Sequence, residues 1–207
     1  MGKFKFWLAV GVAVSCLMSP VVGAQTPMQT PMRVRGDITD FDGHVLSVKT
    51  RNGNALKVSV GDSLVVNSMV ALRISDIRQG SFVGVTALKK EPSGSMYALE
   101  VHVFPETMRG AGEGHRAWDL EPGSTMTNAN VDAIVERNDG KELTLSYKGG
   151  QQKIIVAPGT PVVTFTPGDM SLLKPGAQVF FTAQQAADGT MTAQRIQVGK
   201  NGMKPPM

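Results

Sequence analysis

Thiol chemistry is almost absent from this chain. Cys16 is the only cysteine among 207 residues, and it lies in the N-terminal segment. The small residues Val22-Gly23-Ala24 predict a cleavage after Ala24, which leaves a mature chain without cysteine. The sequence therefore excludes a disulfide, a thiolate nucleophile and a cysteine-based metal site from the mature protein.

Long hydrophobic runs are also scarce. The apolar stretch Phe6 to Met18 follows Lys3 and Lys5 and is too short to span a bilayer comfortably, and no other segment approaches that length. Such a start is typical of an export signal, so we predict a signal peptide over residues 1–24 and a periplasmic or secreted protein. Two alternatives stay open: an uncleaved anchor, and a lipoprotein attached through Cys16, whose context weakly resembles a lipoprotein box.

Charge of one sign is weak, and the familiar catalytic motifs are missing. The formal charge of +4 falls to +2 when Lys3 and Lys5 leave with the signal, which is not the footprint of a nucleic-acid binder. The chain has no H-E-x-x-H, G-x-S-x-G or C-x-x-C pattern, so we expect no enzyme activity. A hydrolase would need a pair of carboxylate or histidine groups that only folding could bring together.

What the sequence does contain is the same β-pattern twice. Residues 34–103 and 131–198 superimpose with an offset of about 96 residues. The matching positions are apolar and turn residues, namely Ile38 with Ile134, Leu46 with Leu143, Gly80 with Gly176, Thr86-Ala87 with Thr182-Ala183, and Ala98 with Ala193. Apolar and turn residues determine a fold, whereas a catalytic or binding site needs clusters of polar residues.

Each repeat predicts three strands, a short helical turn and two more strands. Dipeptides such as Asp42-Gly43 and Asn52-Gly53 accept the positive φ of tight hairpins, and Gly80 and Gly176 end the helical turns. This element order is that of the OB-fold. We therefore predict an all-β protein of two tandem OB-like five-stranded barrels, each with a short helical turn between the third and fourth main strands. A single sandwich formed by both repeats is the alternative.

The domain boundaries follow from these patterns. The first OB-like domain spans 33–104 and the second spans 131–199, with a Gly-rich connector over 105–130. The Pro-rich residues 25–32 and 200–207 predict a disordered lead and a disordered tail. A connector of this length is functional or flexible.

The repeat resembles a known group of proteins. Its pattern of Gly-x-Ile, Asp-Gly, Leu-x-Val, Gly-x-x-Val, Asp-Gly and Ala-x-x-Val is similar to an exported bacterial domain family of unknown function. The resemblance implies OB-like barrels, often in tandem, and says almost nothing about activity. The segment 108–119 is similar to proteobacterial relatives, some labelled metal-transporter permease, a role that needs membrane spans this chain lacks after the signal.

The connector holds the best candidate site. Gly110, Gly112 and Gly114 allow the backbone to approach a ligand closely. Polar and aromatic side chains surround these glycines: Arg109, Glu113, His115, Arg116, Trp118 and Asp119. The alternative is a flexible linker in which Trp118 merely plugs the space between the barrels.

Methionines suggest a second site. Thioethers suit copper, so His115, Met108 and Met126 are the candidate ligands of a copper-type metal. We expect His44 at a hairpin exit and His102 on a strand surface, each solvated rather than ligating.

The sequence thus predicts a periplasmic, non-enzymatic binding module whose partner is an envelope protein, a glycan or a small ligand. A periplasmic copper-handling protein is the alternative. Nucleic acid is not expected as a partner, because strands two and three of each repeat hold only Tyr147 as a stacking aromatic.

Overall fold

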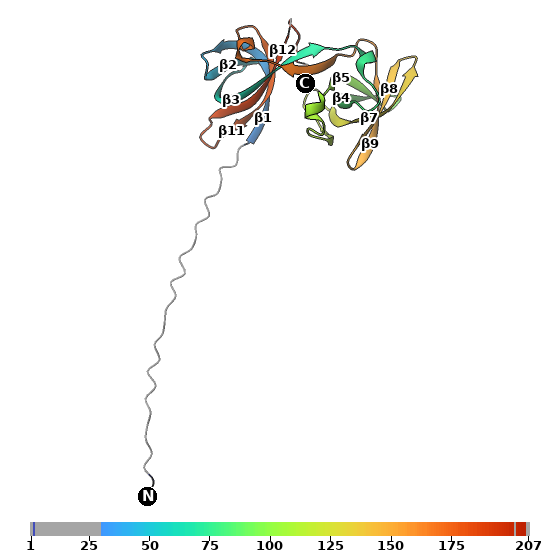
Figure 1. The fold of residues 1–207 in the computed structure, drawn as a ribbon, viewed down its shortest axis with the longest axis horizontal. Helices are drawn as coiled ribbons and strands as arrows, with labels where there is room; N and C mark the ends of the chain where they lie inside the picture. Colours follow the sequence, from blue (N-terminus) through green and yellow to red (C-terminus); the bar gives the residue numbers. More distant parts are fainter. Residues whose placement is uncertain (1, 3–29, 201, 206–207) are drawn as a thin grey trace.

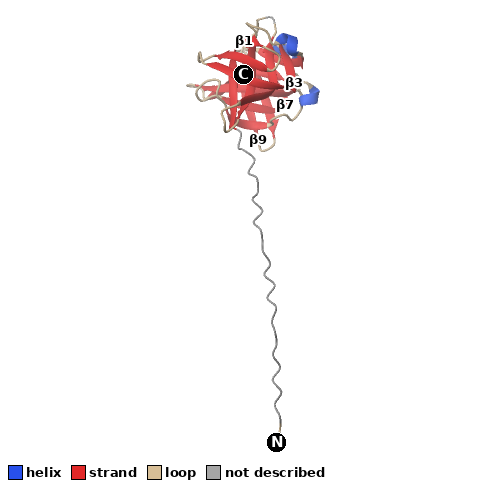
Figure 2. Ribbon diagram, turned by 90° about the vertical axis from the view of Figure 1, so that its left-hand side faces the viewer, coloured by secondary structure: helices blue, strands red, loops and turns tan. Residues whose placement is uncertain are grey.

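The computed structural model describes residues 2, 30–200 and 202–205, which form an all-β protein (Figures 1 and 2). Apart from Gly2, the predicted signal peptide lies outside the described residues, and so do Cys16 and residues 25–29 of the expected lead. The described strands are β1 (Thr30–Phe41), β2 (Val45–Thr50), β3 (Ala55–Ala71), β4 (Phe82–Lys90), β5 (Ser95–Val103), β6 (Gly114–Ala117), β7 (Thr125–Arg137), β8 (Gly140–Tyr147), β9 (Gly150–Val156), β10 (Val162–Pro167), β11 (Gln178–Gln185) and β12 (Met191–Gly199).

The expected helical turns are present as short 3₁₀ helices. They are η1 (Ile74–Asp76) and η3 (Met170–Leu172), and a third, η2 (Glu106–Met108), lies in the connector. Among the described residues, no helix is long and apolar enough to cross a membrane.

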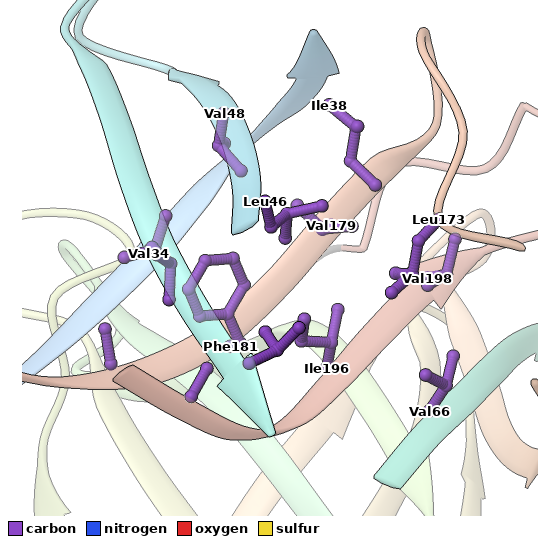
Figure 3. Packing of buried hydrophobic residues seen from close by; sticks show 14 of the residues in the cluster. Val34, Ile38, Leu46, Val48, Val66, Leu173, Val179, Phe181, Ile196 and Val198 are labelled. Carbon is purple, nitrogen blue, oxygen red and sulfur yellow. The ribbon is translucent and has the colours of Figure 1, made fainter. Parts of the chain in front are cut away.

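Five strands form a closed ring, which we call barrel one. Their order is β1-β2-β3-β12-β11, and β11 returns to pair with β1. All neighbours are antiparallel except β3 and β12, which are parallel. The interior holds apolar side chains from every strand. Leu46, Phe181 and Ile196 are among them, each no more than 1% exposed (Figure 3).

The remaining long strands pair in a second ring, which we call barrel two. Here the order is β7-β8-β9-β5-β4, and β4 pairs with β7. The ring closes where β5 meets β9 in parallel through two residue pairs. Its core contains Val83, Val85, Leu143 and Leu145, all fully buried.

The strand pairings differ from the expected tandem arrangement. Barrel one takes β1, β2 and β3 from the first repeat but β11 and β12 from the second, and barrel two takes the complementary set. Residues 33–104 and 131–199 therefore do not each close a barrel of their own. The repeats exchange their last two strands.

The exchange passes through β3 and β10. β3 is 17 residues long. Its residues up to Met69 still pair with β12 of barrel one, and its last five residues, 67–71, also pair antiparallel with β10. In that pairing Met69 lies opposite Phe165, and these two residues are 96 positions apart, the offset of the repeat. Equivalent residues of the two repeats thus face each other, so β3 and β10 are related by an approximate two-fold axis.

The connector and the tail are both packed against the barrels. β6 adds to the edge of β7, and the backbone of residues 125–130 already belongs to β7. The described tail residues differ from the expected disordered segment: Pro205 is buried, and its carbonyl oxygen accepts a hydrogen bond of 2.9 Å from the Arg51 guanidinium. Met203 packs against the apolar cluster between the barrels.

Cutting the connector tests the exchange of strands. A protease site inserted between the exposed residues Pro122 and Gly123 divides the chain between the repeats. We expect the two fragments to co-elute in native size-exclusion chromatography after cleavage and to separate only in denaturant, because each barrel needs strands from both. Separation of the fragments in native buffer would show that each repeat folds by itself.

Candidate ligand-binding site

Polar side chains that point outward from barrel two lie in the space between the barrels. A bulge in β5, where the register shifts between Thr86 and Ala87, moves the following residues by one place. Val101 consequently faces the core, while Glu100 and His102 face outward. Bulges commonly re-aim side chains in this way beside functional sites.

These side chains form two rows across three strands. In one row, Thr86 on β4 lies between Glu100 on β5 and Met126 on β7. In the next row, Gly84 lies between His102 and Asn128. We call this six-residue surface the covered patch. Its side chains are all less than 9% exposed, although they lie outside the barrel.

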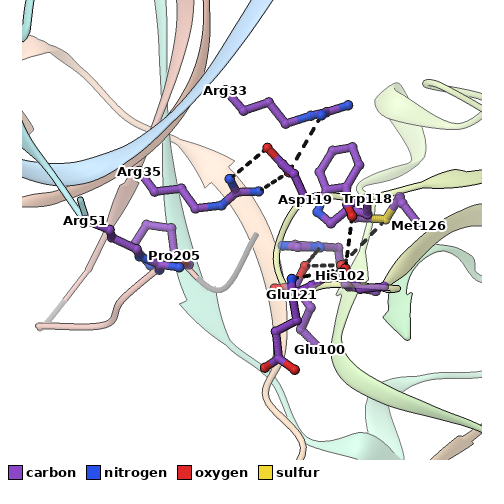
Figure 4. Close-up of polar contacts among 12 residues, drawn as sticks. Arg33, Arg35, Arg51, Glu100, His102, Trp118, Asp119, Glu121, Met126 and Pro205 are labelled. Carbon is purple, nitrogen blue, oxygen red and sulfur yellow. Dashed lines mark hydrogen bonds and ion pairs between the residues drawn. The ribbon is translucent and has the colours of Figure 1, made fainter. Parts of the chain in front are cut away.

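The covered patch contains polar atoms without partners. The Thr86 hydroxyl donates to Glu100 Oε1 at 2.8 Å. Glu100 Oε1 also lies 3.5 Å from His102 Nδ1 (Figure 4). Glu100 Oε2, both ring nitrogens of His102 and Asn128 Oδ1 are buried without a hydrogen-bond partner. Such groups are rare in folded proteins because burying them unpaired is unfavourable.

Burial determines the charge of this pair. It raises the pKa of Glu100 to about 8, against the lowering effect of the Thr86 hydrogen bond and the Arg35 and Arg51 charges. It lowers the pKa of His102 to about 3. At neutral pH both groups are therefore uncharged, and their 3.5 Å contact is not an ion pair.

The connector covers the patch with Trp118. Its ring packs on the apolar cluster of Met69, Val163, Phe165 and Phe180, which joins the two barrels. The His102 ring stacks on Phe165 at 5.3 Å with an interplanar angle of 2°. Trp118 therefore fills the space between the barrels, as the alternative interpretation of the sequence proposed.

On the side of barrel one, arginines gather around one carboxylate. Arg35 donates to Asp119 Oδ1 at 2.8 Å and to Oδ2 at 3.3 Å, and Arg33 lies 3.7 Å from the same carboxylate. The Arg33 guanidinium also lies 4.0 Å from the centre of the Trp118 ring, with Arg116 at 5.5 Å. Asp119 is held between the connector and β1 by these contacts.

These neighbouring charges and partial burial shift the pKa values of Asp119, Arg51 and Arg116. Partial burial raises the pKa of Asp119, but the hydrogen bond and charge of Arg35 outweigh it, so the net pKa is lowered. Burial and the neighbouring Arg35 lower the pKa of Arg51, and burial and Arg33 lower that of Arg116. Arg35 and Arg51 thus lie close enough to repel each other, and so do Arg33 and Arg116.

A cleft of about 580 Å³ opens beside this group. Its charged residues are Arg33, Arg35, Arg51 and Asp119, and we call it the arginine cleft. The turn between β2 and β3 adds the amides of Asn52 and Asn54, and the neighbouring wall is apolar, with Leu56 and Met191.

The connector residues predicted from the sequence separate into two groups. Arg116, Trp118 and Asp119 lie between the barrels as described. Arg109 ties the connector to barrel two through Asn130 Oδ1 at 2.6 Å and the Gly80 carbonyl at 3.0 Å. Glu113 likewise accepts a hydrogen bond of 2.8 Å from the backbone N–H of Lys148.

The predicted metal ligands have different surroundings. His115 hydrogen-bonds Thr127 Oγ1 at 2.8 Å and stacks on Tyr147, Met108 packs against the apolar cluster, and Met126 lies in the covered patch. Within the described residues, no three His, Cys, Asp or Glu side chains form a group suited to a metal. The expectation that His102 is solvated is wrong, because its side chain is 1% exposed.

Sequence reasoning missed the arginines and the covered pair. The alternation Arg33-Val34-Arg35 placed two cations on one face of a strand, and it was the one available signal for the cleft. Comparison with protein-family models, with curated proteins and with solved structures found no match.

The role of Trp118 can be separated into filling space and presenting a polar group. We expect Trp118→Ala to lower the free energy of unfolding by about 3 kcal/mol, because it opens a cavity between the barrels. Trp118→Phe should cost less than half as much, since the indole Nε1 has no hydrogen-bond partner to lose. Urea unfolding of both variants measures this, and equal losses would contradict a space-filling role.

Proposed function

We propose that this protein is an exported, non-enzymatic binding module that recognises an anionic ligand in the arginine cleft. The observation that supports it most is the crowding of guanidiniums at the cleft. Arg33 and Arg35 both contact the Asp119 carboxylate, while the charge of Arg35 acts on Arg51 and that of Arg33 acts on Arg116. Like charges held this close destabilise the free protein, and a bound anion would relieve their repulsion.

The geometry of Arg35 and Asp119 supports a carboxylate or phosphate ligand. Arg35 binds Asp119 through two parallel hydrogen bonds, the arrangement that guanidiniums adopt with planar oxyanions. Asp119 therefore occupies part of the cleft in the way a ligand oxyanion would.

The rest of the cleft favours a ligand that is more than a small ion. Amides of Asn52, Asn54 and Gln185 offer hydrogen bonds, and Leu56 and Met191 offer apolar contact. An acidic glycan of the cell envelope combines such groups, and we take it as the first candidate. A small carboxylate or a phosphorylated compound shares the oxyanion chemistry.

The barrel type is consistent with this role. In both rings the strand order by position is 1-2-3-5-4 with the third and fifth strands parallel, and we infer that both barrels are OB-like. The face of strands 2–3 and the adjoining loops of OB-folds bind oligosaccharides as well as nucleic acids. The cleft includes residues from the β2–β3 turn and the β11–β12 turn of barrel one.

The hydrolase alternative has less support. Glu100 and His102 are a carboxylate–histidine pair brought together by folding, as that alternative required, but both are 0% exposed beneath the connector. A substrate could reach them only if the connector moved away.

Binding measurements with charge variants test the proposal. Isothermal titration with oligogalacturonate should give an affinity about tenfold lower for Arg51→Gln, corresponding to the loss of about 1.5 kcal/mol in a charge-assisted hydrogen bond. Asp119→Asn should bind more tightly than the parent, because the competing carboxylate is gone. Arg78→Gln, an exposed residue outside the cleft, is the matched control.

Citrate and inorganic phosphate, titrated in the same way, identify which oxyanion source is preferred. If Arg51→Gln and Arg78→Gln behave alike with every probe, or if no probe binds, the arginine cleft is not an anion site.

A further inference from the structure

The covered patch is unusual when the two repeats are compared. In barrel two Gly84 pairs with His102, and in barrel one the equivalent pair is Phe180 with Gln197. Glu100 corresponds by position to Arg195, which is exposed. The barrel framework therefore requires neither a carboxylate nor an imidazole at these positions, and both occur only where the connector covers them.

Covering an ionisable pair has an energetic cost. Carboxylate and imidazole groups without hydrogen-bond partners destabilise a folded protein unless something else binds them. Glu100 Oε2 and both ring nitrogens of His102 are in this situation. Apolar residues beneath the connector would carry no such cost. A function of the Glu100–His102 pair therefore explains best why ionisable groups are buried here.

The spacing of the pair fits one kind of ligand. Ligand atoms about 2.1 Å from a tetrahedral metal ion are separated from each other by about 3.4 Å. Glu100 Oε1 and His102 Nδ1 are 3.5 Å apart. We propose that Glu100 and His102 bind a late first-row transition-metal ion, zinc or copper, beneath the connector.

Neighbouring residues can complete the coordination. Met126 lies in the same row as Glu100. The Thr86 hydroxyl between them donates to Glu100 and lies 3.9 Å from Met126 Sδ. Asn128 Oδ1, in the row of His102, is also buried without a partner. An imidazole with a thioether favours copper, and an imidazole with a carboxylate favours zinc.

The His102 ring is held for this role. It stacks on Phe165, which fixes its plane, and Trp118 and Phe104 surround the same apolar cluster. A metal ion binds the neutral imidazole and the ionised carboxylate, so Glu100 releases its proton when the ion binds. This site is separate from the arginine cleft and does not depend on the function proposed for it.

The experiment uses the whole chain stripped of metal and then exposed to one equivalent of Zn²⁺, Cu²⁺ or Cu⁺, with Mg²⁺ as the hard-ion control. After desalting, metal content by mass spectrometry should approach one ion per chain for zinc or copper and remain near zero for Mg²⁺. Competition with a chromophoric chelator gives the affinity.

Matched variants assign the ligands. We expect His102→Gln, the residue found at the equivalent position of barrel one, to weaken binding at least about 100-fold while the variant still unfolds cooperatively. Glu100→Gln should weaken it similarly. His115→Gln, at a surface histidine, should leave the affinity unchanged.

Any of the following results would overturn the proposal. One is a parent chain that retains no zinc or copper after desalting. Another is a His102→Gln variant that binds as tightly as the parent, or a His115→Gln variant that loses the metal instead. If only Met126→Leu abolishes copper retention while Glu100→Gln does not, the Glu100–His102 pair is likewise not the site.

Discussion

The antiparallel pairing of β3 with β10 is the constraint on which the rest of this structure depends. A strand of 17 residues is too long for one side of a small barrel, so β3 carries the chain out of barrel one. β10 makes the return crossing, and the two meet at Met69 and Phe165. Once the chain crosses there, the last two strands of each repeat can only complete the opposite barrel.

The crossing also explains where the candidate sites lie. It places the outer face of barrel two opposite β1 of barrel one, and the connector runs through the space between them. Trp118 fills that space on the apolar cluster, and Asp119 reaches Arg35 on β1. The two repeats are alike in strands but not in surroundings, because only the first is followed by the connector. The polar residues of the candidate sites, Glu100, His102 and the arginines, lie where this symmetry is broken.

The local features of the fold could be predicted from the sequence, since they depend on residues close together in the chain. Asp42-Gly43 forms its turn as expected, with Gly43 at a φ of 100° and the Asp42 carboxylate accepting from the backbone N–H groups of His44 and Val45. The partners of the strands could not be predicted. Because the repeats share one apolar pattern, β1 fits β4 and β11 equally well, and the sequence alone does not distinguish Val34 opposite Phe181 from Val34 opposite Val85.

The positions of the candidate site residues could be predicted only in part, for a similar reason. The connector residues stood out by composition, and Arg116, Trp118 and Asp119 do lie together between the barrels. Strand alternation shows which side chains share a face, but it does not show what covers that face, so His102 was expected in solvent.

The one measurement that tests this account most directly is the set of interstrand nuclear Overhauser effects in solution. Contacts of Val34 with Phe181, and of Val85 with Thr127, are the result predicted for exchanged strands. Contacts of Val34 with Val85 would contradict it, because they would mean that each repeat closes its own barrel.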